Sequence, residues 1–285
     1  MLWATAYAGI KIGLQYDTPF HFAGVRFIIS GLIILPFTVK PVVYIRMIRE
    51  QWKVVAFVTI LQIVVNYSLF YQGLNLVPGA LGAVIYGSQP LIIAVVAAIS
   101  HKGDKLTRKK IIMITFGISG VILISVGRQV FRLGTEFELL GVAMILIANL
   151  ATATSNIIIS LKSKINPFVL SSASLFTGGL ILYLISVPVE QGPRLPMPME
   201  YWMALIWLSL MAATAFSIWF KLLQRPGVKV SELNLWKFLT PVAGAGLSWL
   251  LVPNEHPEWL TILGMIIITT SLIMYYKTVK EISPV

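Results

Sequence analysis

Cysteine is absent from this chain of 285 residues, and charged residues are scarce. Without a thiol the chain has no disulfide, zinc-thiolate site, iron–sulfur cluster or cysteine nucleophile. Only 12% of the residues are charged and 57% are hydrophobic, whereas a soluble domain carries about twice that share of charge. The mean hydropathy of +0.85 points the same way. The composition therefore predicts an all-α integral membrane protein and excludes an ordinary soluble globule.

Long apolar runs make up most of the sequence. A bilayer core of about 30 Å requires about 20 mostly apolar residues for each helix that crosses it. Ten such runs, separated by short connections, are Leu2–Tyr16, Phe22–Val39, Val54–Leu74, Ala80–Ser100, Ile111–Gly127, Leu139–Leu161, Phe168–Pro188, Trp202–Phe220, Val230–Val252 and Trp259–Tyr276. The first run is short and lacks the basic region and cleavage site of a signal peptide. We therefore expect it to be a first span whose beginning is missing from this sequence.

Basic residues outnumber acidic ones 22 to 11, and they gather on one side of the predicted spans. Sixteen of the 22 fall in the even-numbered connections and the C-terminal tail, and three fall in the odd-numbered connections. The other three, Lys11, Arg26 and Lys237, lie inside spans. Because positive residues remain in the cytoplasm, this distribution predicts ten spans in the cell membrane with both termini cytoplasmic. It also removes nucleic acid as the explanation of the positive charge.

Two halves of the chain repeat the same landmarks at an offset near 150 residues. Pro19 opens the second span and is followed twelve residues later by Gly31, and Pro167 and Gly179 have the same spacing in the seventh span. Each half contains five predicted spans. Since five is an odd number, the second half lies upside down relative to the first. The fold expected is therefore ten transmembrane helices as a 5+5 inverted repeat, with halves at residues 1–127 and 139–277.

The stretch LVPGALGAVIYGSQPLIIAVVAAISHKGDKLTRKKIIMITFGISGVILI resembles the EamA-type repeat of the drug/metabolite transporter superfamily. The opening LWATAYAGIKIGL, with Pro19 and Arg26 after it, resembles the same repeat, and the second half matches it more loosely. The second half has Ser174 where the first half has Arg26. The resemblance implies a ten-helix carrier with a central cavity, and many members of the family are thought to export amino acids or other metabolites.

Two prolines mark the predicted transport site. Pro90 and Pro241 each lie ~15 Å inside their spans, from opposite sides of the membrane. A proline inside a helix frees backbone carbonyls, which at membrane depth must face protein or a wet cavity. Corresponding kinks in inverted halves point to the substrate site of a transporter. We expect substrate contacts from the neighbouring Tyr86, Gln89, Trp236, Lys237 and Thr240; the alternative is that the kinks only shape packing.

The embedded cations are the second indication of a site. A charge at the bilayer centre costs about 2.5–3.5 kcal/mol on insertion scales, so it normally faces a pathway or a wet cavity. Lys237, ~10 Å from the inner end of its span, is the predicted counter-charge for a carboxylate or phosphate, unless it extends towards Glu232. Lys11 and Arg26 lie within ~8 Å of the outer ends of their spans. They either contribute to binding or extend to the interface.

Neutral polar residues complete the candidate substrate site. Asn66 lies in the third span, Asn149 and Asn156 recur at helical spacing in the sixth, and Trp219 lies in the eighth. Such side chains bind a substrate or join helices to one another. The glycine-containing fifth and tenth spans are candidates for a homodimer contact. No metal or cofactor site is predicted.

Three classes of function remain to be compared. The first is a secondary transporter of a small metabolite. No carboxylate lies inside a predicted span to form a proton relay, which favours an exporter or exchanger. The second is an intramembrane enzyme, which the chain argues against because His21, His101 and His256 are predicted in separate loops and no catalytic motif occurs. The third is a lipid-head-group flippase or a non-transporting membrane component. We expect a non-enzymatic transporter of a small molecule in the lipid bilayer.

Overall fold

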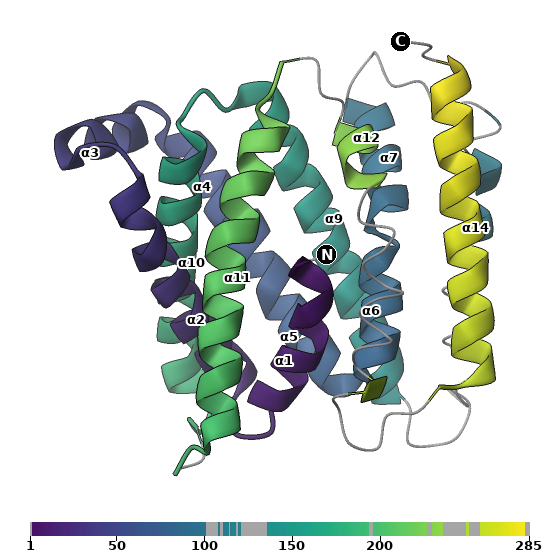
Figure 1. Ribbon diagram of the computed structural model, residues 1–285, viewed down its shortest axis with the longest axis horizontal. Coiled ribbons are helices and arrows are strands. Elements are labelled where there is room, and N and C mark those ends of the chain that lie inside the picture. The colour runs from purple at the N-terminus through teal and green to yellow at the C-terminus, as the bar shows by residue number, and fades with distance from the viewer. Residues whose placement is uncertain are drawn as a thin grey trace.

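The computed structural model describes residues 2–100, 108, 111–113, 115–117, 119–120, 136–193, 196–226, 230–235, 249–250 and 257–282. All regular structure in these ranges is helical, which confirms the all-α prediction (Figure 1). Five segments are long and apolar enough to cross a membrane: Pro19–Phe37, Trp52–Leu76, Phe137–Lys162, Pro167–Val189 and Met199–Leu223. The shorter segments Ile85–Ser100 and Trp259–Ser271 are also apolar. The chain is therefore a multi-pass membrane protein.

The helices follow the predicted spans closely wherever the structure describes them. In the first half they are η1 (Leu2–Thr5), α1 (Ala6–Gly13), α2 (Pro19–Ile34), η2 (Leu35–Phe37), α3 (Pro41–Glu50), α4 (Trp52–Val58), η3 (Thr59–Val65), α5 (Asn66–Leu76), α6 (Gly79–Gly87) and α7 (Gln89–Ser100). In the second half they are α9 (Glu136–Lys162), α10 (Pro167–Val189), α11 (Met199–Leu223), α12 (Val230–Leu235) and α14 (Trp259–Ile282). Most of the fifth and ninth predicted spans lies outside the described residues.

Proline fixes where the central helices begin. Pro19 and Pro167 occupy the first turns of α2 and α10, where the missing N–H leaves no hydrogen bond unmade. The side chain of Asn166 caps α10 by accepting a hydrogen bond from the N–H of Phe168 at 2.9 Å. These starts place α2 and α10 in register for the closest helix contact of the bundle.

The α2–α10 contact is made backbone against backbone. A Cβ added at Gly31 would lie 2.7 Å from the backbone N of Phe176, and one at Gly179 would lie 2.6 Å from the backbone N of Ile28. Small residues allow helices in a membrane to approach in this way. Ser172 adds a hydrogen bond from its Oγ to the carbonyl of Gly31 at 3.0 Å. Together with α11, this pair forms one side of the bundle in Figure 1.

The connection after the second span contains a helix that the apolar runs did not predict. This helix, α3, projects sideways from the bundle (Figure 1). Val42 and Ile45 are exposed, whereas Tyr44 packs on the core and donates a hydrogen bond to Ser172 at 3.3 Å. Exposed apolar residues beside Arg46 and Arg49 are typical of a helix in the membrane interface.

Candidate functional site

A cluster of amide and phenol side chains lies at the centre of the bundle, between α5, α6, α7 and α9. Tyr86 donates a hydrogen bond to Oδ1 of Asn66 at 3.5 Å. Three residues further along the chain, Nε2 of Gln89 donates to Oδ1 of Asn149 at 3.4 Å. Asn66, Gln89 and Asn149 are all at most 1% exposed. The structure therefore brings together four of the residues that the sequence singled out.

Two interruptions of regular helix hold these side chains in place. Helix α6 ends at Gly87 and α7 begins at Gln89, so the fourth span is broken at Ser88, two residues before Pro90. The carbonyl of Ile85 accepts the backbone N–H of Ser88 at 3.1 Å and, in addition, Oγ of Ser88 at 2.7 Å and Nδ2 of Asn149 at 3.0 Å. A side chain of α9 is thereby bound directly to the broken backbone.

The second interruption is a π-helical segment, η3, in the middle of the third span. It ends immediately before Asn66, whose Nδ2 donates to the carbonyl of Gln62 at 3.3 Å. π-Helical turns inside helices are frequent at functional sites because they redirect side chains. Here the segment places Gln62 and Asn66 next to one another in the interior of the bundle.

Several buried polar atoms of this region have no hydrogen-bond partner among the described residues. They include Oε1 of Gln62, Oγ of Ser155 and Nδ2 of Asn156. Leaving such an atom unpaired costs about 1–3 kcal/mol. The interior therefore offers both hydrogen-bond donors and acceptors to a polar ligand or to water.

Aromatic side chains extend the polar cluster along α9. Trp219 on α11 donates from Nε1 to Oδ1 of Asn156 at 3.2 Å. Asn156 lies two turns beyond Asn149, ~10 Å along the helix axis. The ring of Trp219 is packed edge-on against Trp3, with centroids 5.4 Å apart. The predicted polar stripe on α9 thus runs from Asn149 in the amide cluster to Asn156 beside the rings of Trp219 and Trp3.

Arg26 is the buried cation of the described bundle. It is 1% exposed, so the alternative that it extends to the interface is wrong. Nη1 donates to Oη of Tyr71 at 2.5 Å and Nε donates to the carbonyl of Leu208 at 3.3 Å. Its guanidinium lies over the rings of Phe27, at 4.8 Å, and Tyr67, at 5.8 Å, which is favourable for a cation.

Helix α2 begins three residues earlier than the predicted span, so Arg26 lies two turns, ~10 Å, from the start of the helix. Tyr67 and Asn66 are consecutive on α5, so this residue pair connects the cation to the amide cluster. Lys11 is half-buried on α1. Trp236, Lys237, Thr240 and Pro241 lie outside the described residues, so the second predicted kink stays a prediction.

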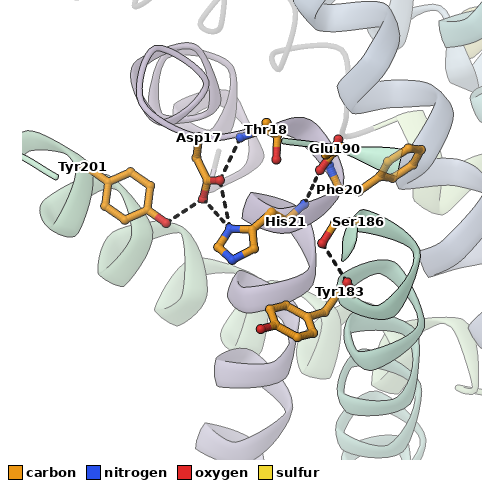
Figure 2. Close-up of polar contacts among 8 residues, drawn as sticks. All are labelled: Asp17, Thr18, Phe20, His21, Tyr183, Ser186, Glu190 and Tyr201. Atoms are coloured by element: carbon orange, nitrogen blue, oxygen red, sulfur yellow. Dashed lines mark hydrogen bonds and ion pairs between the residues drawn. The ribbon is translucent and has the colours of Figure 1, made fainter. Parts of the chain in front are cut away.

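A separate group of polar side chains lies at the N-terminal end of α2 (Figure 2). Nδ1 of His21 lies 2.8 and 2.9 Å from the two carboxylate oxygens of Asp17, and Tyr201 donates to Asp17 at 2.7 Å. His21 was predicted in a loop, but it lies in the first turn of α2. The prediction was wrong because Pro19 starts the helix before the apolar run begins.

Relatives with known names match nearly the whole chain. The model of the "EamA-like transporter family" matches residues 1–126 and 139–277. The Bacillus subtilis transporter YvbV is 23% identical over 95% of this chain and 87% of its own length. A "Probable amino-acid metabolite efflux pump" of Escherichia coli is 23% identical over 95% of this chain and 90% of its own length.

A solved structure has the same fold. A crystal structure of another protein superposes on this chain with a TM-score of 0.71 at 15% sequence identity. The match covers 97% of this chain and 95% of the other. With a family match over both halves, named transporters among its relatives and a membrane-embedded polar interior, the chain belongs to the EamA-like transporter family.

Proposed function

We propose that the protein is a secondary transporter that exports or exchanges a small, anionic or zwitterionic metabolite by alternating access. The observation that carries this proposal is the cluster of Asn66, Tyr86, Gln89 and Asn149 at membrane depth. Polar side chains inside an apolar bundle are expensive to bury, and in membrane proteins they mark substrate pathways. A break in one helix and a π-helical turn in another supply movable backbone beside them.

The contacts between α2 and α10 support an inverted repeat. An offset of 148 residues relates Gly31 to Gly179 and Ile28 to Phe176. Gly31 lies against Phe176 and Gly179 lies against Ile28, so the offset converts the first contact into the second. A two-fold axis in the membrane plane, running through this helix pair, has that effect.

Other helix contacts follow the same rule. Helix α5 of the first half packs on α9 of the second, and α11 of the second half packs on α1 of the first. Helix α7 packs on α12, which the same offset relates to α6, so the fourth span contacts the start of the ninth. We therefore propose ten spans in two inverted halves, residues 1–127 and 139–277, with the substrate between them.

The charges of the described connections support cytoplasmic termini. Helices α2, α7, α9 and α11 end at the face drawn uppermost in Figure 1. The segments at that face carry Lys40, Arg46, Arg49, Lys53, Lys162, Lys164, Lys221 and Arg225. Asp17 and Glu190 lie at the opposite face. By the positive-inside rule the upper face is cytoplasmic in the cell membrane.

The substrate class follows from the positive charge that the interior retains. Arg26 has no carboxylate partner in the described part of the chain, and Lys237 is proposed as a second cation. A carboxylate or phosphate on the substrate matches these groups, and amide side chains match its neutral polar atoms. The E. coli relative is named as a probable efflux pump for amino-acid metabolites, which agrees with a zwitterionic substrate.

A binding screen tests the proposal. Amino acids, organic acids, phosphorylated metabolites and cationic drugs are tested on purified protein by thermal shift, with Gln89→Ala and Lys237→Ala alongside. Gln15→Ala and Lys277→Ala, which change exposed residues, are the matched controls. An anionic or zwitterionic ligand should stabilise the wild type and both controls but neither site variant. Equal responses from all five proteins, or binding of cations alone, would overturn the proposal.

A further inference from the structure

The outer end of the bundle contains a second titratable site, separate from the amide cluster. Asp17 lies in the corner between α1 and α2, His21 in the first turn of α2, Glu190 at the end of α10 and Tyr201 at the start of α11 (Figure 2). The carboxylate of Asp17 is fully buried, whereas the side chain of His21 is 20% exposed. Water can therefore reach the histidine while the aspartate is sealed beneath it.

Three residues donate hydrogen bonds to the side chain of Asp17. Its Oδ1 accepts from the N–H of Thr18 at 2.7 Å, and its Oδ2 accepts from Oη of Tyr201 at 2.7 Å. Nδ1 of His21 lies within 2.9 Å of both oxygens. The carboxylate of Asp17 is thus surrounded by hydrogen-bond donors from three residues. Since Nδ1 faces two acceptors, it carries a hydrogen, and a further proton on the ring binds at Nε2.

The surroundings of His21 are acidic. Asp17 and Glu190 are the charged groups that act on it in the described part of the chain, and the phenol ring of Tyr183 lies 5.5 Å from its ring. Glu190 accepts from the N–H groups of Phe20 and His21 at 2.8 and 3.0 Å. A proton on His21 thus offsets one of two neighbouring negative charges and turns its hydrogen bond to Asp17 into an ion pair.

The same bonds join the two halves of the chain. Tyr201 and Asp17 are 184 residues apart, and Glu190 and Phe20 are 170 apart. Alternating access requires the outer ends of the halves to separate in part of the cycle. The bond between Tyr201 on α11 and Asp17 in the α1–α2 corner must then break. A proton on His21 favours the closed arrangement because it offsets the repulsion between Asp17 of the first half and Glu190 of the second.

We propose that Asp17, His21 and Tyr201 form a proton-binding site that keeps the outer end closed while His21 carries a proton. The ligand of this site is a proton from the outer medium, and its release allows α11 to move away from the α1–α2 corner. This inference rests on the proposed function for the alternating motion and for the side of the membrane.

Distance measurements between spin labels test the proton site. The chain has no cysteine, so Gln15→Cys in the corner and Met199→Cys on α11 introduce the only two labels, both at exposed positions. From about pH 5 to about pH 8, the population with the shorter distance should fall by about two- to tenfold. His21→Gln should abolish this dependence on pH, because glutamine does not titrate.

Two further variants separate the proton from general loosening. Asp17→Asn keeps the histidine but removes its ion-pair partner, and should also remove the pH response. Tyr201→Phe should favour the longer distance at both pH values, whereas the matched control Tyr44→Phe, at the opposite face, should leave the distances unchanged.

The distance measurements test the proton site independently of the ligand screen. A pH response that persists in both His21→Gln and Asp17→Asn, or a wild type whose distances ignore pH, overturns the proton site even if a metabolite binds. A pH response that follows His21 in a protein that binds no metabolite supports the proton site and counts against the proposed substrate class.

Discussion

Adding a single methyl group at Gly179 should separate the two central helices. An ideal Cβ at this position would lie 2.6 Å from the backbone N of Ile28 and 2.9 Å from the carbonyl O of Gly24. Ordinary contacts begin at 3.4 Å. Because the obstructing atoms are backbone, Gly179→Ala requires α2 and α10 to move apart by roughly 0.8 Å at this point, from the difference between 2.6 and 3.4 Å.

The expected loss of stability follows from the cost of overpacking. Forcing extra atoms into a well-packed interior costs about 1–3 kcal/mol, and alanine recovers up to about 1 kcal/mol in helix propensity. A net loss of about 1–2 kcal/mol corresponds to a fall of roughly 2–8 °C in Tm for a chain of this size. Gly31→Ala should behave alike, because its Cβ would lie 2.7 Å from the backbone N of Phe176.

Thermal unfolding of purified protein in detergent measures both variants. Gly9→Ala is the matched control, since a Cβ there meets only the side chain of Leu208, at 3.2 Å, and gains the same helix propensity. Its Tm should stay within about 2 °C of the wild type, as for a substitution without backbone obstruction. Equal Tm values for Gly179→Ala and Gly9→Ala would refute the close backbone contact.

Three further substitutions test individual side chains. Arg26→Met removes a buried charge but also the partner of buried Tyr71, so these opposing effects should leave the Tm nearly unchanged. The variant should weaken an anionic ligand by about tenfold or more, and unchanged affinity in a thermal-shift titration would contradict this. Trp219→Phe leaves Oδ1 of Asn156 without its donor and should lower the Tm by an amount equivalent to about 1–3 kcal/mol. Tyr44→Phe removes a 3.3 Å bond to Ser172 and should cost at most about 1 kcal/mol by the same measurement.

The sequence predicted the helices well because each must be apolar along its length to cross the bilayer. Helical spacing also placed Asn149 and Asn156 on one buried stripe of α9. The π-helical segment η3 could not be predicted, since nothing in TILQIVV distinguishes it from an ordinary apolar helix. Its geometry depends on how the third span packs on its neighbours.

The positions of Arg26 and His21 illustrate where hydropathy alone misleads. A count of apolar residues put the start of the second span at Phe22, but Pro19 starts the helix. The earlier start includes His21 in the first turn of α2, four residues after Asp17, and puts Arg26 two turns into the helix. The spacing of four residues between Asp17 and His21, with proline between them, was a usable signal for their pairing. Of the aromatic residues around Arg26, Phe27 is its neighbour in the sequence, whereas Tyr67 and Tyr71 come from α5 and could be known only from the tertiary structure.

The glycine contact between α2 and α10 also restricts which parts of the molecule can move. Two helices whose backbones already touch cannot approach further, and any separation exposes peptide groups to hydrocarbon. The α2–α10 pair is therefore expected to stay fixed in the proposed transport cycle. The motion of that cycle would then fall to the helices around the pair, where the break at Ser88 and the π-helical segment η3 interrupt regular helix.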